Sequence, residues 1–149
     1  MPGGFFEQWK VGDRIVHDLR RTVTETDNLL ISTLTHNPQP LHLDADYAGA
    51  TEFGQILVNG IFTFGLMIGI SVGDTTLGTL VANLGYDKVV MPNPVFIGDT
   101  LRAETEIMEV RASKSRPDSG LVTFYHSMFN QRDEVVCNCL RTALLRKTP

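Results

Sequence analysis

The sequence has little cysteine and no excess of positive charge. Its two cysteines, Cys137 and Cys139, flank a single residue, so on a strand they share a face and are poorly placed for a disulfide. This pattern predicts a reducing compartment, and we expect a cytoplasmic protein. With 13 Lys and Arg against 17 Asp and Glu, the net charge of −4 argues against a broad nucleic-acid-binding face. A small anionic ligand would need only a local basic patch.

The chain also lacks clear membrane-targeting segments. Residues 1–7, MPGGFFE, have neither the basic start nor the apolar stretch of a signal peptide. Residues 55–73 carry no charge, but the run is near the lower limit of about 18 residues for a bilayer span and has no flanking aromatic or basic anchors. We therefore predict a helix that is buried on all sides, and no membrane partner.

Several catalytic signatures are missing as well. There is no P-loop, no GxGxxG, no GxSxG elbow, no HExxH and no CxxC. Their absence disfavours nucleotide hydrolysis, dinucleotide binding and serine hydrolysis. His36, His42 and Asp44 offer two nitrogens and an oxygen, but no further His or Cys lies nearby, so we expect no metal ion.

What is present suits one soluble domain spanning residues 1–149. The apolar fraction is 42% and the charged fraction 20%. A strand is expected over 13–19, followed by a helix that begins at Thr24 and carries Leu29, Leu30 and Leu34 at helical spacing. Pro38 ends it, so that residues 35–42 form a stiff loop. A short helix from Asp44 to Ala50 then precedes the uncharged helix.

The second half of the chain alternates like β-strands. In the run from Leu101 to Val110 the apolar positions shift by one residue near Ile107 and Met108, which predicts a β-bulge. The other expected strands are 79–84, 87–91, 121–129 and 134–145, with a polar hairpin loop over 111–120. This order predicts an α+β domain in which a curved antiparallel sheet wraps a long helix. Gly65 and Gly69 would let the sheet approach that helix closely.

Two places carry candidate chemistry. His17 and His126 lie in expected strands and are interpreted as surface or satisfied core residues. His36 and His42 instead bracket the double-proline loop, with Asn37 between them. Because the prolines hold the loop in a defined conformation, His42 and the polar Asn37 could act as acid, base and water-orienting group on a bound water. The alternative is that the loop is only a turn, since turns are often rich in Asn and Pro.

The second place is the start of the uncharged helix, at Asn59 and Gly60. Its free N–H groups suit a thioester oxygen that gains negative charge. Glycine there would let that oxygen approach closely. The alternative is a glycine needed for packing.

Three stretches together resemble the MaoC-like, R-specific enoyl-CoA hydratase family, which has the hot-dog fold. They are HNPQPLH at 36–42, ILVNG at 56–60 and PVFIGDTL at 94–101. The resemblance covers nearly the whole chain from Thr24 onward. It implies an α+β hot-dog domain and a homodimer, or a dimer-based oligomer, whose sheets join edge to edge.

The family uses an Asp and a His, five residues apart, to hold and activate water. His42 matches the His, but Asn37 stands at the Asp position and His36 at the preceding Gly. An amide orients water and cannot take its proton. His42 therefore acts alone as base, or His36 takes over, or the chain does not catalyse.

The resemblance implies an acyl-CoA hydratase or dehydratase without any cofactor besides the coenzyme A of its substrate. His42 would deprotonate water, Asn37 would orient it and Gly60 N–H would stabilise the enolate, with His36 and Asn59 beside the substrate. Lys114 and Arg116 would meet a coenzyme A phosphate or a substrate carboxylate, unless they are merely solvated loop charges. The residues at 35–42, THNPQPLH, and at 113–118, SKSRPD, also resemble the branch of the family that handles mesaconyl- or itaconyl-CoA.

Two other functions stay open. A hot-dog acyl-CoA thioesterase would need a carboxylate to activate water, and residues 55–73 contain none. A non-catalytic acyl-CoA-binding or partner subunit would explain Asn37 in place of the Asp. The position of His42 relative to the Gly60 N–H discriminates among these functions.

Overall fold

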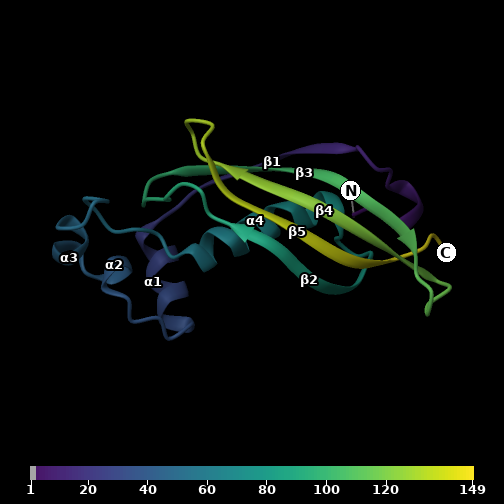
Figure 1. Ribbon diagram of the computed structural model, residues 1–149, viewed down its shortest axis with the longest axis horizontal. Helices are drawn as coiled ribbons and strands as arrows, with labels where there is room; N and C mark the ends of the chain where they lie inside the picture. Colours follow the sequence, from purple (N-terminus) through teal and green to yellow (C-terminus); the bar gives the residue numbers. More distant parts are fainter. Residues whose placement is uncertain (1–2) are drawn as a thin grey trace.

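A five-stranded antiparallel sheet, with one long helix packed against it, organises the chain in the computed structural model, which describes residues 3–149 (Figure 1). The elements are η1 (Phe6–Gln8), β1 (Arg14–Thr22), α1 (Glu25–Leu34), α2 (Pro40–Leu43), α3 (Ala45–Gly49), α4 (Gly60–Thr75), β2 (Leu80–Val90), β3 (Thr100–Ala112), β4 (Ser119–Phe129) and β5 (Val135–Arg146). The strand order is β1-β3-β4-β5-β2. The predicted α+β architecture is confirmed.

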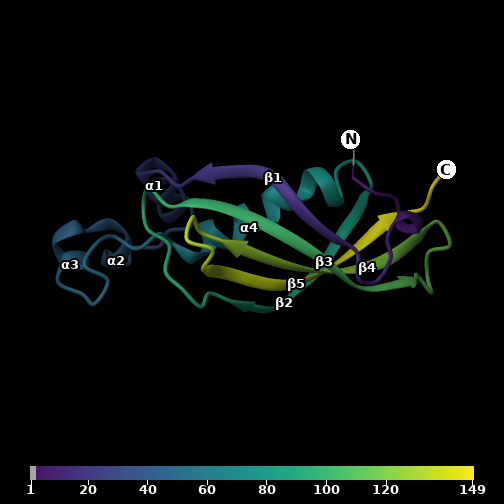
Figure 2. The same cartoon turned by 90° about the horizontal axis from the view of Figure 1, so that it is seen from above.

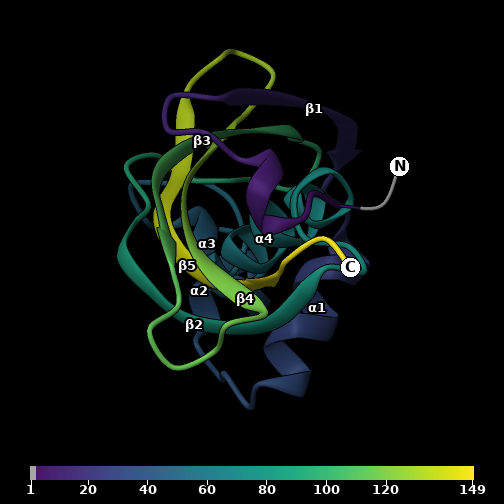
Figure 3. The same ribbon diagram turned by 90° about the vertical axis from the view of Figure 1, so that its right-hand side faces the viewer.

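The sheet curves around α4, as the end-on view shows (Figure 3). Helices α1, α2 and α3 gather at one end of the sheet, and both chain termini lie at the other (Figures 1 and 2). The β4–β5 turn lies at the α1–α3 end, and the β3–β4 turn lies at the end with the termini. The sheet therefore has two distinct ends.

Local capping sets where the helices begin. Thr24 Oγ1 accepts from Asp27 N–H at 3.2 Å, and the Asp27 side chain accepts in return from Thr24 N–H, so α1 opens with a capping box. Asp44 caps α3 through the Tyr47 N–H. Both starts agree with the sequence-based expectation. The expected loop is shorter than predicted, because Pro40 occupies the first position of the helical turn α2.

Two expectations about helix α4 are wrong. It is not buried on all sides, since Ile61 is 54% exposed and Gly65 and Gly69 are also exposed. A Cβ atom built on Gly65 or Gly69 meets nothing within 4 Å, so these glycines do not bring the sheet closer. The physical reason is that the sheet covers only one side of α4. An apolar face of this helix is left uncovered in the single chain.

The strands follow the predicted order with one merger. The two strands expected at 79–84 and 87–91 form a single irregular strand, β2, whose pairing with β5 shifts register three times. Within this strand, Lys88 adopts a φ of 51°, between the last two paired residues, Asp87 and Val90. The predicted bulge in β3 is confirmed by a register shift between Ile107 and Glu109.

The core holds both cysteines as reduced thiols. Cys137 and Cys139 are free, fully buried and on the same face of β5, as the spacing predicted. Burial raises the pKa of the Cys137 thiol to about 11 and that of Cys139 to about 12. Both therefore stay protonated at neutral pH and are poor nucleophiles.

A chain of polar contacts runs from the exposed Asp74, near the end of α4, into the core. His17 Nδ1 lies 2.6 Å from Asp74 Oδ2, and its Nε2 lies 2.7 Å from Thr105 Oγ1. Thr105 Oγ1 lies 2.8 Å from His126 Nδ1, while His126 Nε2 has no partner. Both histidines are core residues, but only His17 is fully satisfied. Burial lowers the pKa of His126 well below its usual value, with the nearby Arg141 cation as the next cause.

This shift predicts a specific loss of stability in acid. Because the unfolded chain binds a proton near pH 6.5 that folded His126 refuses, stability should fall as the pH drops below about 6.5, by up to about 1.4 kcal/mol per pH unit. Urea unfolding at pH 7.5 and 5.5 should show a loss about 1 kcal/mol larger in the wild type than in His126→Gln. Equal losses in the two proteins would contradict this assignment.

Candidate active site

His42 is held by a main-chain carbonyl next to the pocket at the start of α4. It is half-buried on α2, and its Nδ1 lies 2.7 Å from the carbonyl oxygen of Leu57. A carbonyl oxygen only accepts, so Nδ1 carries the proton in the neutral ring. The lone pair is then on Nε2. His42 is thus fixed in the tautomer that a general base requires.

The segment before α4 links this histidine to the sheet end. Leu57 N–H donates to Leu41 O at 3.1 Å, and Val58 N–H donates to Val95 O at 2.9 Å. Leu57 also forms an isolated bridge with Phe96. Residues 56–58 therefore lie between the α2 turn and the loop that follows β2.

A cavity of about 320 Å³ opens beside this segment. Its lining is mainly apolar and comes from the α3–α4 connection, the first turn of α4, the loop after β2 and the start of β5: Phe53, Leu57, Val58, Gly60, Thr63, Met91, Pro92, Asn93, Pro94, Val95 and Val136. Such a pocket suits an acyl chain. Leu57 lines it and accepts the His42 hydrogen bond, so His42 is joined to the pocket wall through Leu57 and is not itself a lining residue.

The N-terminus of α4 supplies a free donor to this cavity wall. Asn59 caps the helix, its Oδ1 accepting from Ile61 N–H at 3.0 Å. Among the hydrogen bonds of residues 3–149, none uses the N–H of Gly60. A Cβ on Gly60 would lie 2.5 Å from Met91 Sδ, so any side chain here would have to displace the flexible end of Met91. The helix dipole favours negative charge at this point.

Two residues that the sequence reading missed hold these parts together. Asn28 is buried in α1; its Nδ2 donates to His42 O at 2.9 Å and its Oδ1 accepts from Asn59 N–H at 2.8 Å. Ser32, one turn later, accepts from Asn59 Nδ2 at 3.3 Å. Their spacing of four residues places both polar side chains on one face of α1, and this was the feature of the sequence that could have identified them. The helix was instead predicted from the spacing of its leucines, and Leu29, Leu30 and Leu34 are exposed in the structure.

Replacing Asn28 with leucine should therefore damage the site and the fold together. The change leaves the Asn59 N–H unpaired and frees the His42 turn, so we expect a stability loss of about 2 kcal/mol and a roughly 10- to 100-fold lower kcat. Urea unfolding and steady-state kinetics measure the two effects. Leu29→Ala, at a neighbouring exposed position, is the control and should change stability by less than about 0.5 kcal/mol.

Asn37 is not hydrogen-bonded to His42. Its Oδ1 accepts from Gln39 N–H at 3.0 Å, and its main-chain N–H donates to Ser32 O at 2.9 Å. With the exposed His36 it lines a separate shallow hollow of about 280 Å³. The structure thus brings His42, Asn59 and Gly60 to one region and places the predicted partners His36 and Asn37 on another surface of the loop.

Lys114 and Arg116 lie still farther away. They belong to the β3–β4 turn, which is at the sheet end opposite α2 (Figures 1 and 2). Their side chains line another hollow, together with residues of β2. Within one chain they do not reach the pocket beside His42.

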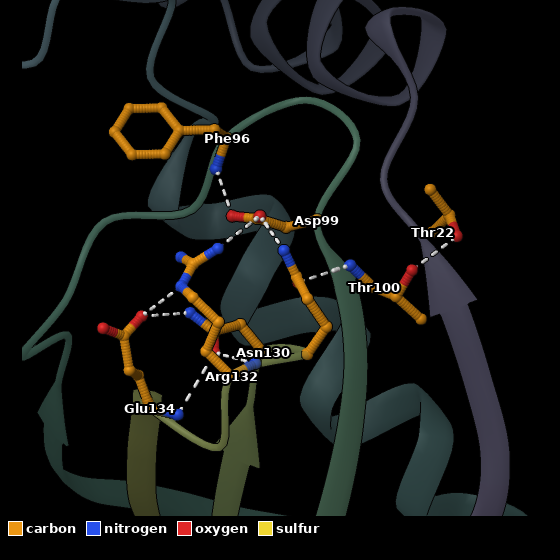
Figure 4. Close-up of polar contacts among 8 residues, drawn as sticks. Thr22, Phe96, Asp99, Thr100, Asn130, Arg132 and Glu134 are labelled. Carbon is orange, nitrogen blue, oxygen red and sulfur yellow. Dashed lines mark hydrogen bonds and ion pairs between the residues drawn. The ribbon is translucent and has the colours of Figure 1, made fainter.

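A polar network braces the loop that forms one wall of the pocket (Figure 4). Asp99 is 6% exposed; its Oδ2 accepts from Phe96 N–H at 2.9 Å and its Oδ1 accepts from Gln131 Nε2 at 2.8 Å. On the β4–β5 turn, which also carries Gln131, Asn130 Nδ2 donates to Glu134 Oε2 at 2.6 Å, and this hydrogen bond lowers the pKa of the Glu134 carboxyl. Asp99, within the motif at 94–101, therefore holds the loop that carries the pocket residues Pro94 and Val95.

The structure offers no group of three or more potential metal ligands among its described residues. Within the same part of the chain, no helix is both long and apolar enough to cross a bilayer.

Comparison with known proteins agrees with this architecture. The family model described as "MaoC like domain" matches residues 7–126. The chain belongs to the MaoC-like domain family. It is 34% identical, over 97% of its length, to a mesaconyl-CoA hydratase of Cereibacter sphaeroides. It is 32% identical, over 98% of its length, to a beta-methylmalyl-CoA dehydratase of Chloroflexus aurantiacus.

The chain spans about two fifths of these relatives, 42% of the first and 41% of the second. A MaoC-like dehydratase from Rhodospirillum rubrum matches with a TM-score of 0.85 and 31% identity over 99% of both chains. A Mycobacterium tuberculosis protein described as having a double hotdog fold matches with a TM-score of 0.89 and 24% identity, over 99% of this chain and 45% of that one. The fold of this MaoC-like domain is therefore the predicted hot-dog fold.

Proposed function

We propose that this MaoC-like domain adds water across the double bond of an enoyl-CoA thioester, or removes it in the reverse direction. The observation that carries the proposal is the His42 Nδ1 contact with Leu57 O, because it leaves Nε2 free as a base on a side chain that is joined to a lining residue of an apolar pocket. The Gly60 N–H at the start of α4 lines the same pocket. Base and oxyanion donor then serve one substrate.

The chemistry follows from these two groups. His42 Nε2 takes a proton from water as the water oxygen bonds to the β-carbon of the conjugated thioester. The electron pair of the double bond moves toward the thioester oxygen, where the Gly60 N–H and the α4 dipole stabilise it. His42 then returns its proton to the α-carbon. No cofactor is required, since the thioester itself makes the α-carbon acidic.

The relatives support this substrate class. Their printed names are mesaconyl-CoA hydratase and beta-methylmalyl-CoA dehydratase, and a more distant relative is a 3-hydroxybutyryl-CoA dehydratase. We propose a coenzyme A thioester with a short enoyl chain, mesaconyl-CoA being one member of the panel to be tested. Cytoplasmic localisation stays a prediction.

We further propose that the working unit is a homodimer joined through β2. Each edge of the sheet has a free strand. On β1 the exposed apolar residues are Val16 and Leu19, among three arginines, whereas β2 exposes four large apolar side chains. The exposed apolar residues of β2 are Leu84, Tyr86, Val89 and Val90. Together with the uncovered face of α4 they form a surface that a soluble chain rarely leaves open. The relatives of more than twice this length support a second hot-dog unit as the covering partner.

A hydration assay tests the proposed activity. Loss of the enoyl-thioester absorbance is followed with crotonyl-CoA, mesaconyl-CoA and itaconyl-CoA, while free thiol is measured in parallel. We expect turnover of at least one substrate without release of coenzyme A. Thiol release at the same rate would establish a thioesterase instead. If only Asn37→Asp were active, the natural Asn37 would have switched the site off, and a binding role would replace catalysis.

A further inference from the structure

The side chain of Met91 lies against the start of α4. A Cβ atom built on Gly60 would lie 2.5 Å from Met91 Sδ and 3.0 Å from Met91 Cε, so the thioether rests on the bare α-carbon of this glycine. Both residues line the pocket. The sulfur is therefore next to the Gly60 N–H, which no hydrogen bond among residues 3–149 uses.

The main chain around Met91 is held in place. Met91 directly follows the end of β2 and precedes the run PNP at 92–94, in which each proline fixes its own φ. Between the prolines, Asn93 Nδ2 donates to Val135 O at 2.8 Å, which ties the loop to β5. The Met91 side chain has three rotatable bonds and is the movable part. Its sulfur therefore stays close to Gly60 whichever rotamer of the last bonds it adopts.

Met91 is also open to a dissolved oxidant. Among the described residues, Met67 and Met128 are fully buried, whereas Met91 is 43% exposed and Met108 is 46% exposed. Met108 does not line the pocket. Both cysteines are fully buried thiols, so a peroxide reacts with them slowly. The exposed thioethers are therefore the sulfur atoms that a peroxide attacks first.

We propose that Met91 is a site of reversible oxidation by hydrogen peroxide, and that its sulfoxide oxygen accepts a hydrogen bond from the Gly60 N–H and thereby excludes the thioester oxygen. The sulfur lone pair attacks one peroxide oxygen, the S–O bond forms as the O–O bond breaks, and water leaves. The sulfur is oxidised and the peroxide is reduced.

The oxidised side chain suits this place better than the thioether does. A thioether is a weak hydrogen-bond acceptor, whereas a sulfoxide oxygen carries partial negative charge. The N-terminus of α4 favours negative charge and offers an unused donor at Gly60. The sulfoxide would thus occupy the position that a thioester oxygen needs. The effect on catalysis rests on the proposed function, while the contact itself does not.

Peroxide treatment, peptide mass spectrometry and kinetics together test the inference. The sulfoxide fractions at Met91 and Met108 are measured beside kcat/KM for crotonyl-CoA. We expect kcat/KM to fall in proportion to the Met91 sulfoxide fraction, the fully oxidised form being about 100-fold less active, as for loss of one oxyanion donor. Methionine sulfoxide reductases A and B, supplied with a dithiol, should restore the activity.

Two leucine variants separate Met91 from the other targets of peroxide. Met108→Leu removes the equally exposed methionine outside the pocket, so its activity should fall under peroxide as that of the wild type does. Met91→Leu should keep its own starting activity, whatever that value is, through the same treatment. Equal fractional losses in Met91→Leu and the wild type would overturn the inference, and so would oxidation of Met108 that leaves Met91 unmodified.

The amide resonance of Gly60 in a heteronuclear NMR spectrum reports the contact without any turnover. On oxidation, its proton should move downfield and exchange more slowly in the wild type and Met108→Leu, and stay unchanged in Met91→Leu. This result supports the inference even if the chain hydrates no thioester, an outcome that would overturn only the proposed function. A complete Met91 sulfoxide with an unchanged Gly60 resonance would overturn the inference while leaving the proposed function intact.

Discussion

His42→Ala is expected to lower kcat for enoyl-thioester hydration by about 10³-fold, the typical contribution of a positioned acid/base group. The reason is the fixed tautomer: Leu57 O holds Nδ1–H at 2.7 Å, and the alanine variant loses the Nε2 lone pair that this contact leaves free. Steady-state kinetics with the preferred substrate measure the loss, and circular dichroism checks that the fold persists.

The neighbouring histidine provides the control for this prediction. His36 is exposed, adopts a φ of 55° and lines a different hollow. His36→Ala should therefore retain kcat within a few-fold of wild type. The opposite ranking, with His36→Ala inactive and His42→Ala active, would move the base to His36 and refute the assigned site.

Gly60→Val is expected to reduce kcat/KM by about 100-fold with little effect on folding, since it obstructs the donor for the developing oxyanion. Even the first carbon of a side chain at Gly60 would lie 2.5 Å from Met91 Sδ, so a branched side chain must displace the end of Met91, which lines the same pocket. Kinetics with short enoyl thioesters measure the loss, and thermal unfolding reports stability.

Gly73→Val separates this effect from a general effect of valine in α4. A Cβ at Gly73 meets nothing within 4 Å, and Gly73 lies in the last part of the helix, away from the pocket. It should keep activity close to wild type. If both variants lost activity equally, the loss would come from the helix as a whole and not from the oxyanion donor.

The features that sequence predicted well depend on short-range chemistry. Thr24 and Asp44 each accept a hydrogen bond from an N–H three residues away, so the starts of α1 and α3 could be predicted from these residues alone. The bulge near Ile107 likewise follows from the phase of the alternating side chains. His42 and Gly60 were singled out from the double-proline loop and the helix start, and the resemblance then gave them roles; Gly60 lines the pocket, and His42 is joined to it through Leu57.

The features that sequence missed depend on distant partners. Asn28 is buried because its amide bonds His42 and Asn59, which are 14 and 31 residues away, and no local pattern encodes that choice. An apolar helix such as α4 gives no indication of which face the sheet will cover. The exposed faces of Gly65 and Gly69 follow from tertiary packing, and so does the turn that engages Asn37 Oδ1 away from His42.

Incubation of crotonyl-CoA in water labelled with heavy oxygen, followed by mass spectrometry of the products, tests whether this MaoC-like domain adds water to a carbon–carbon double bond with His42 as base. We predict an intact thioester with the label in a hydroxyl group on the β-carbon, formed by the wild type and not by His42→Ala. Label found in a free carboxylate, or equal hydroxylation by both proteins, would contradict it.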